Sequence, residues 1–285
     1  MRIKAWSVTS VRHRNLDPDW HYAGRNVPEL PGLRVALRAG GQAGEGYAPF
    51  LPHLDNSPAA LIETGRNIAS AMVNADLTDL DDCVTRLGPC ARSLNAARSA
   101  VEMALLDLAA RARGKSVVQL LGGEARTIEV LRIIPVKSPA RMAELAGDYA
   151  GQGYRALKLK ATGDIDADVE RVTAVRAAVG AAIALTVDAN QGYDMAGALA
   201  FERCLRPLDV WSIEQPVPAT DREALAVLRR EARVRIEADE GLFTHADLDD
   251  VLAREAADSI SLKLARSGGL LPSRSMALAA TCKGV

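Results

Sequence analysis

The sequence contains no paired-cysteine motif and no long apolar run, and both absences narrow the range of protein classes. None of its four cysteines belongs to a CxxC pair or has a histidine nearby, which argues against a zinc site at Cys83, Cys90, Cys204 or Cys282. We expect free thiols in a reducing cytoplasm, with a Cys83–Cys90 disulfide as the alternative. No apolar segment is long enough to cross a bilayer, and the N-terminus alternates like a strand, unlike a signal peptide. A cytoplasmic location is therefore expected.

Strong net charge and nucleotide-binding glycine motifs are also missing. The formal net charge is -1, so we expect neither nucleic acid nor an anionic membrane as the main partner. No GxGxxG or GxxxxGK[ST] occurs, which disfavours a doubly wound nucleotide-binding sheet. The chain has 285 residues, of which 48% are hydrophobic and 25% charged. This profile is typical of a globular protein with one large α/β barrel or two ordinary domains.

Residues 1–125 are predicted to form an N-terminal α+β domain, in which strands are followed by helices. Its strands lie at Arg2–Thr9, at Leu33–Ala39 and after Gly40-Gly41, which is the predicted turn of a small antiparallel sheet. Helical periodicity covers residues 57–73 and 91–113.

Residues 126–285 show a different pattern, in which short apolar strands alternate with amphipathic helices. The six strand segments are IEVLRIIP, RALKLK, AIALTVDAN, DVWSIEQP, RVRIEADE and SISLKLA. Repeated strand–helix units predict a parallel sheet, and six in succession favour a TIM-type (β/α)-barrel over a doubly wound sheet. Because a complete barrel has eight units, we expect either a barrel that is incomplete at its C-terminus or a natural protein that continues beyond Val285.

Polar residues stand near the C-terminal end of five of these strands, where barrel enzymes carry their functional groups. Each residue alone has an ordinary explanation, such as a solvated lysine, a turn or a helix cap. From one strand to the next, these polar residues follow at nearly equal intervals of about one strand–helix unit. We therefore expect them at one level of the barrel mouth. They are Lys158 and Lys160, Asp188 and Asn190, Glu214, Asp239 and Glu240, and Lys263.

The residue types in this set predict a particular chemistry. Three carboxylates on adjacent strands, Asp188, Glu214 and Asp239, form an oxygen donor set suited to Mg²⁺. In an eight-stranded ring Lys160 and Lys263 would face each other across the metal, where a neighbouring cation lowers the pKa of an amine. Such a site suits removal of the α-proton of a carboxylate, with the metal stabilising the enediolate and a second lysine returning the proton.

At this point the sequence resembles the enolase superfamily, and within it the muconate lactonizing enzyme subgroup of the mandelate racemase/muconate lactonizing enzyme family. AVEMALLDLAARARGKSVVQLLGG, residues 100–123, is similar to the end of the family's N-terminal capping domain. LKLK, VDANQGYD, IEQPVP, EADEG and SLKLARSGGL follow in the family's order. The mandelate racemase subgroup is a poorer match, because it has a His–Asp pair where Lys263 and its neighbours stand. Family members normally run through strands seven and eight, so the resemblance implies a C-terminally truncated barrel.

The resemblance implies a role for each residue of the set. Asp188, Glu214 and Asp239 would bind Mg²⁺, with Mn²⁺ as an alternative cation. Lys160 and Lys263 would be the two acid/base catalysts, and Lys158 would assist electrostatically. Asn190 and Glu240 would orient the metal-ligating side chains without binding the metal themselves. Such a lysine base with bound Mg²⁺ is the pattern of enolase-superfamily sites.

The N-terminal domain is expected to supply specificity through loops over the barrel mouth. The candidate segments are His13–Pro31, which includes Trp20, and Tyr47–Leu54. The family tendency toward oligomers implies a homo-oligomer.

Together these features predict a metal-dependent isomerase that acts on a small carboxylate. Its most direct form is a racemase or epimerase of an amino-acid derivative or a dipeptide. Muconate-type cycloisomerisation and dehydration are alternatives within the same chemistry. A catalytically inactive truncated barrel is the alternative outside it.

Overall fold

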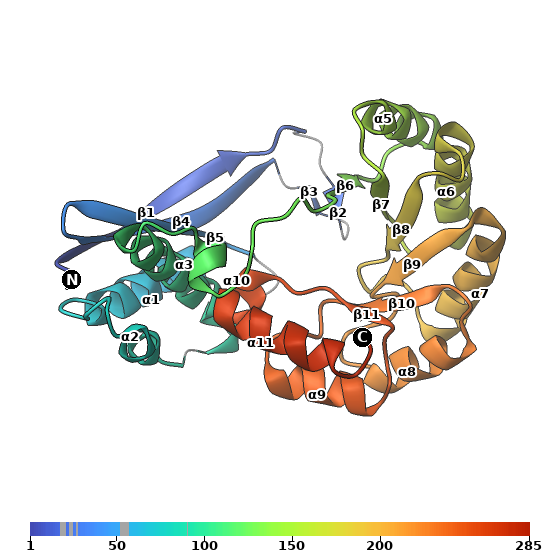
Figure 1. Ribbon diagram of the computed structural model, residues 1–285. Helices are drawn as coiled ribbons and strands as arrows, with labels where there is room; N and C mark the ends of the chain where they lie inside the picture. The colour runs from blue at the N-terminus through green and yellow to red at the C-terminus, as the bar shows by residue number, and fades with distance from the viewer. Residues whose placement is uncertain (18–20, 23–24, 27, 52–56, 90) are drawn as a thin grey trace. The chain divides into compact units, whose positions relative to one another are not determined.

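The computed structural model describes residues 1–285 except 18–20, 23–24, 27, 52–56 and 90 (Figure 1). The chain divides into two compact units. Unit 1 comprises Met1–Asn15, Glu29–Arg126 and Leu262–Ala277, and unit 2 comprises Leu16–Pro28, Thr127–Ser261 and Leu278–Val285. A single boundary between residues 125 and 126 stays a prediction.

Unit 1 contains a three-stranded antiparallel sheet in the order β1-β4-β5. Its strands are β1 (Ala5–Arg14), β4 (Glu29–Ala39) and β5 (Gln42–Pro49). Gly40 and Gly41 form the β4–β5 turn with φ of 54° and 77°, a left-handed conformation that glycine adopts at little cost. The predicted sheet and its turn are confirmed, although the first strand begins at Ala5, not at Arg2.

The helices of unit 1 pack around α3 (Asn95–Ala112), whose alanines and leucines favour a helix and are largely buried. Close packing against β5 is possible because Gly44 and Gly46 face α3, and a Cβ on Gly46 would lie 2.0 Å from the carbonyl oxygen of Ala100. The others are α1 (Pro58–Ala71), α2 (Leu80–Leu87), η1 (Arg92–Leu94), α4 (Val117–Leu120), α10 (Leu264–Ser267) and the first part of α11 (Leu270–Thr281).

Unit 2 is built on a six-stranded parallel sheet in the order β11-β10-β9-β8-β7-β6. The strands are β6 (Leu131–Ile134), β7 (Ala156–Lys160), β8 (Ala184–Asp188), β9 (Val210–Glu214), β10 (Arg235–Ala238) and β11 (Ser259–Ile260). Five α-helices and a 3₁₀ turn connect them, and the α-helices lie along the outer side of the curved sheet (Figure 1). These are α5 (Pro139–Gly151), α6 (Ile165–Val179), α7 (Met195–Leu205), η2 (Arg206–Leu208), α8 (Arg222–Glu231) and α9 (His245–Ala253).

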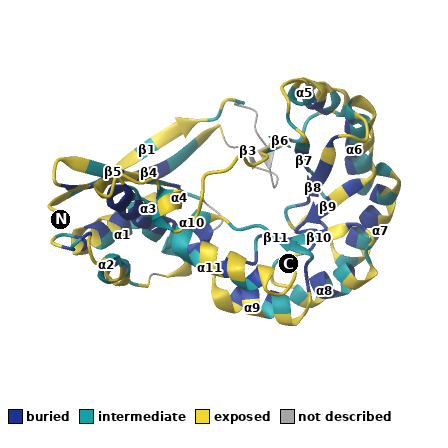
Figure 2. Ribbon diagram, viewed as in Figure 1, coloured by how far each residue is buried: buried dark blue, intermediate teal, exposed yellow. Residues whose placement is uncertain are grey.

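The connecting helices each carry buried and exposed residues (Figure 2), as the predicted amphipathic pattern requires. The predicted succession of six strand–helix units is therefore confirmed. Within Leu16–Pro28, β2 (His21–Tyr22) and β3 (Arg25–Asn26) form a short antiparallel pair. Among the described residues, none of the helices combines the length and the apolar character that crossing a bilayer requires.

The sixth strand is shorter than the sequence pattern predicts. β11 pairs with β10 through only Ser259 and Ile260, and two further backbone hydrogen bonds flank the pair, from the Asp258 N–H to the Ile236 carbonyl and from the Ser261 N–H to the Ala238 carbonyl. The expectation that this strand carries Lys263 is wrong, because Lys263 stands beyond it as the N-cap residue of α10. Glycines at 268 and 269 and the contacts of the following segment with α3 favour a helical turn at this point.

Candidate active site

Three predicted site residues form a continuous row across adjacent parallel strands. In the sheet register Lys160 on β7 lies opposite Asp188 on β8, and Asp188 lies opposite Glu214 on β9. Asp239 follows β10 directly. Because carboxyl ends of parallel strands meet at one edge of the sheet, the four side chains gather at the edge where barrel enzymes bind substrates.

The three carboxylates are buried and are balanced by the lysines of β7. Asp188, Glu214 and Asp239 are 2%, 0% and 0% exposed. The Lys158 amine forms an ion pair with Glu214, and the Lys160 amine forms one with Asp188. Lys160 also donates to Asn190 Oδ1 at 2.9 Å. The two lysines therefore neutralise different members of the carboxylate group.

Burial and mutual repulsion dominate the electrostatics of this group. Loss of solvent, followed by the negative charge of Asp188, raises the pKa of Glu214 to about 8, although the Lys158 charge opposes the shift. Burial disfavours the charged amine of Lys158, but the negative charges of Glu214, Asp188 and Glu237 outweigh it and raise the Lys158 pKa. Asp188, Glu214 and Asp239 thus interact strongly enough to require compensating positive charge.

The donor set fits Mg²⁺ in chemistry and in charge. Its oxygens are hard ligands on three neighbouring strands, and their repulsion is the kind that a divalent cation relieves. Within the part of the chain that the structure describes, no three acidic, histidine or cysteine side chains already converge on one point as a formed ion cage. Here the amines of Lys158 and Lys160 contact Glu214 and Asp188, so two of the three carboxylates are engaged by ammonium groups.

The predicted supporting residues contact the site as a network. Asn190 receives a hydrogen bond from Lys160, donates its backbone N–H to Asp188 Oδ1 at 3.0 Å and donates its amide to Glu240 Oε1 at 2.9 Å. Asn190, Gln191 and Gln215 have φ of 44°, 67° and 40°, which is uncommon for residues other than glycine. Such backbone conformations cluster at functional sites, where the surrounding structure holds them in place.

Two functional features were missed in the sequence. Gln215 is buried and accepts the Asp239 N–H at 2.9 Å through Oε1, which fixes the backbone of a carboxylate residue. Thr186, Ser212 and Glu237 each stand two residues before a carboxylate of the set. Because side chains alternate along a strand, they share the face of that carboxylate, and the same rule could have identified them.

Asp168 joins the loops that follow β7 and β8. It is 1% exposed and accepts hydrogen bonds from Thr162 N at 2.8 Å, Gly163 N at 3.0 Å and Tyr193 Oη at 2.7 Å. The Arg171 guanidinium completes the cluster at 2.7 Å. Thr162 lies just after Lys160 and Tyr193 just after Asn190, so Asp168 fixes both loops of the site.

Lys263 belongs to unit 1, whereas the carboxylates and Lys160 belong to unit 2. The predicted pairing of the two lysines across one site therefore stays a prediction. The Lys263 carbonyl accepts hydrogen bonds from Arg266 N at 2.8 Å and Ser267 N at 3.0 Å, the first turn of α10.

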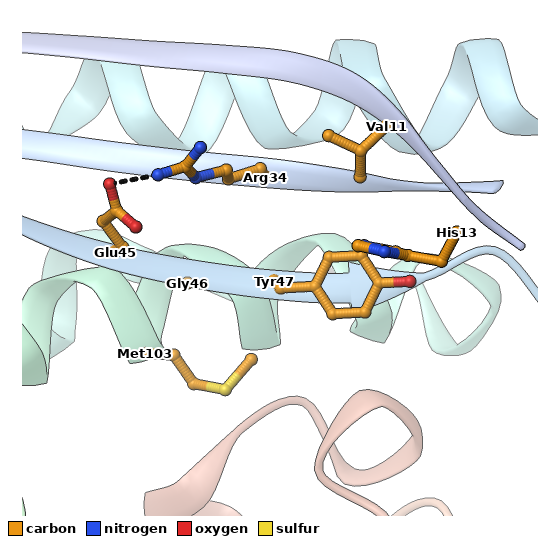
Figure 3. A pocket seen from close by; sticks show the side chains of 7 residues that line it. All are labelled: Val11, His13, Arg34, Glu45, Gly46, Tyr47 and Met103. Atoms are coloured by element: carbon orange, nitrogen blue, oxygen red, sulfur yellow. Dashed lines mark hydrogen bonds and ion pairs between the residues drawn. The ribbon is translucent and has the colours of Figure 1, made fainter. Parts of the chain in front are cut away.

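The two predicted specificity segments begin at a cavity of unit 1. His13 packs edge-on against Tyr47, with ring centroids 4.9 Å apart, beside an ion pair between Arg34 and Glu45 (Figure 3). The cavity has a volume of about 870 Å³, and Val11, Gly46 and Met103 also line it. Burial raises the pKa of Tyr47. Trp20 and residues 52–54 of the predicted segments lie outside the described residues.

Family models match most of the chain. Residues 11–122 match the mandelate racemase/muconate lactonizing enzyme N-terminal domain, and residues 141–285 match the enolase C-terminal domain-like model. The chain belongs to the mandelate racemase/muconate lactonizing enzyme family. The resemblance identified from the sequence motifs is thereby confirmed, as is the TIM-barrel class of its strand–helix region.

The relatives of this family member include racemases and epimerases. The L-Lys-D/L-Arg epimerase of Methylococcus capsulatus is 31% identical over 279 residues, which are 96% of this chain and 78% of the relative. The N-succinyl-L-Arg/Lys racemase of Bacillus cereus is 34% identical over 191 residues, and the match spans 66% of this chain but only 52% of that relative. A dipeptide epimerase from M. capsulatus, solved with Mg and the dipeptide L-Arg-D-Lys, has a TM-score of 0.92 and 29% identity. That match covers 100% of this chain and 81% of the solved one.

Proposed function

We propose that this chain catalyses Mg²⁺-dependent racemisation or epimerisation of an N-acylated amino acid or a dipeptide, in which one base removes the α-proton and a second base delivers a proton to the opposite face. The observation that carries the proposal is the row of Lys160, Asp188 and Glu214 in register on adjacent strands, with Asp239 beside it. Relatives of about 30% identity carry the names of such enzymes, which supports the substrate class.

Asp188, Glu214 and Asp239 would hold the Mg²⁺ ion, with Mn²⁺ as an alternative. When bound, the ion supplies stabilisation of the negative charge that develops on the substrate carboxylate. Lys160 would take or return the α-proton at its Nζ atom, and Lys263 would do so from the other face. Lys158, held beside Glu214, would keep positive charge near the substrate carboxylate.

The test is proton exchange in D₂O with Mg²⁺, followed by NMR, on L-Ala-L-Glu, L-Lys-L-Arg and N-succinyl-L-arginine. Replacement of the α-proton by deuterium with appearance of the epimer supports the proposal. Appearance of an unsaturated or cyclised product instead would assign the site to dehydration or cycloisomerisation. Absence of metal-dependent exchange from every compound of this panel and of a wider carboxylate library would overturn the proposed activity for this chain.

A further inference from the structure

The segment that follows Lys263 is held by one face of α3. Asn95, Arg98 and Glu102 stand at helical spacing, so their side chains share this face. Asn95 Nδ2 donates to the Arg266 carbonyl at 2.8 Å, and Arg98 Nη1 donates to the Gly268 carbonyl at 2.5 Å. All of these residues belong to unit 1.

Glu102 is the central contact of this face. Its side chain is completely buried, and its carboxylate accepts the Leu270 N–H and, at 3.2 Å, the Leu271 N–H. These are the first two amides of α11, whose orphan donors and positive end favour a nearby negative charge. Arg98 Nη1 lies 3.4 Å from the other Glu102 oxygen and forms an ion pair with it.

The backbone of the segment passes directly against this carboxylate. Gly268 and Gly269 have φ of 88° and 139°, a region that other residues rarely adopt. A Cβ atom on Gly269 would lie 2.1 Å from Glu102 Oε2, which no real side chain could tolerate. The two glycines therefore fit a chain path that is set by contact with Glu102.

The same segment is rigidly connected to Lys263. The Gly269 N–H donates to the Leu264 carbonyl at 2.9 Å, and the Ser267 hydroxyl donates to the Lys263 carbonyl at 3.1 Å. Ser267 Oγ in turn lies 2.5 Å from Ser273 Oγ in α11. Only the one-turn helix α10 and the two glycines after it separate Lys263 from Leu270 and Leu271, which Glu102 holds, so a displacement of these leucines displaces Lys263.

We propose that Glu102, assisted by Arg98, is a positioning residue for Lys263. This inference rests on the proposed function, in which Lys263 is the second acid/base catalyst. Lys160 is fixed by its own strand and by the Asp168 loops, whereas Lys263 depends on a helix from the N-terminal part of the chain. The two directions of the reaction should therefore respond differently to a change in α3.

The decisive variant is Glu102→Gln in the full chain, and Glu202→Gln is its matched control. Glu202 is also completely buried, pairs with an arginine four residues away and accepts two backbone N–H groups, those of Arg233 and Val234. Those groups precede β10, at the end of the strand opposite Asp239. A general effect of losing a buried carboxylate should therefore appear in both variants.

The readout is deuterium exchange at the α-carbon, measured separately from each epimer of the fastest panel compound. Lys160→Ala and Lys263→Ala first assign each epimer to the lysine that takes its proton. Glu102→Gln is expected to slow exchange from the Lys263 epimer at least tenfold and to leave exchange from the Lys160 epimer within about twofold. Equal slowing of both epimers, or no change in either, would overturn the proposal. Glu202→Gln should produce no such difference between epimers.

A second measurement does not need activity. Amide hydrogen exchange of residues 264–271 and acetylation of the Lys263 amine by acetic anhydride should both change in Glu102→Gln and not in Glu202→Gln. Unchanged exchange and acetylation in Glu102→Gln would overturn the positioning role, even where the wild-type chain turns over no panel compound and the proposed function itself fails. Where Glu102→Gln does not fold, Asn95→Ala removes the bond to the Arg266 carbonyl and should give smaller changes in the same direction.

Discussion

Lys158 and Lys160 lie on the same face of β7 but have different electrostatic environments. Lys158 contacts Glu214, and the surrounding carboxylates outweigh its burial and raise its pKa, so it keeps its proton. Lys160 contacts Asp188 and Asn190 at the end of the strand. We propose Lys158 as a fixed positive charge, because it keeps its proton, and Lys160 as the base, because it ends the strand in register with Asp188.

Replacing either proposed base should abolish epimer interconversion without removing the metal site. Lys160→Ala and Lys263→Ala each eliminate one proton-transfer group, and positioned acid/base groups are worth about 10²- to 10⁴-fold in rate. NMR in D₂O measures the interconversion, and calorimetric titration should find Mg²⁺ binding retained. Lys115→Ala, at an exposed position, is the control and should keep wild-type rates. Full activity in both base variants would contradict the two-base assignment.

At the scale of the elements, Asp168 makes the loops after β7 and β8 into one assembly. Asp168→Asn removes the charge that Arg171 pairs with and replaces one acceptor oxygen by a donor, next to Thr162, Gly163 and Tyr193. Breaking such a buried pair typically costs about 3 kcal/mol. We expect a loss of that order in urea unfolding, together with a lower kcat, because the Lys160 loop loosens.

Tyr193→Phe is a milder change at the same contact, and its loss of stability is compared with that of Asp168→Asn. It removes a single hydrogen bond of 2.7 Å to the same carboxylate and leaves the aromatic packing on Phe201 in place. The expected destabilisation is about 1 kcal/mol. An equal or greater loss in Tyr193→Phe than in Asp168→Asn would show that Asp168 is not the centre of this loop assembly.

A second link between elements joins Asp17 to Lys137, which follows β6. The ion pair spans 3.2 Å within unit 2, and the Arg171 guanidinium holds the Lys137 carbonyl at 3.1 Å. Since Asp17 belongs to a predicted specificity segment, Lys137→Ala should raise KM severalfold and leave kcat nearly unchanged. Steady-state kinetics on the fastest of the three test compounds measures KM and kcat separately. The reversed pair, Asp17→Lys with Lys137→Asp, should restore KM, and a fall in kcat without a change in KM would contradict the assignment.

These elements differ in how much of their role could be predicted from sequence. Lys160, Asp188 and Glu214 were predictable because each ends a strand and the units repeat at a regular interval, which places them at one level. Asp168 was not, since DIDAD at a helix start has the composition of a solvated acidic cap, and its burial depends on Tyr193 from a later loop. The role of Glu102 could not be predicted either, because its partners Leu270 and Leu271 lie far along the chain.

β11 illustrates a different limit. The alternation in SISLKLA favours a longer strand, but a strand forms only where a neighbour pairs with it. Only Ser259 and Ile260 pair with β10, and the chain then turns into α10. The residue type at position 263 was identifiable from sequence, whereas its place on a helix cap was set by contacts with α3.

At the scale of the whole molecule, folding brings three carboxylates together that the unfolded chain keeps apart. The strand order brings Asp188, Glu214 and Asp239 to neighbouring strands, where all three are buried and the two β7 lysines pair with Glu214 and Asp188. The fold therefore stores electrostatic repulsion at the site, and a divalent cation that binds there should stabilise the folded chain as a whole.

Mg²⁺ should therefore stabilise the protein more strongly at higher pH. The pKa of Glu214 is raised to about 8 in the fold from its ordinary value of 4.5, so between these values the metal-free folded chain holds more protons than the unfolded chain. Its free energy of unfolding then falls as pH rises through this window. A bound cation replaces the proton, so the rise in Tm on adding Mg²⁺ to chelator-treated protein should grow across the window, with protons released on binding.

Calorimetry in Mg²⁺ and in EDTA, at pH values below, within and above this window, measures the effect. At a Mg²⁺ concentration about 100 times Kd the stabilisation should reach about 2.7 kcal/mol. Glu214→Gln is the control, because its side chain is neutral throughout: the metal-free variant should lose the pH dependence between 4.5 and about 8. A Tm increase that is the same at every pH would contradict the carboxylate site, since a cation bound to Asp188, Glu214 and Asp239 must compete with the proton of Glu214.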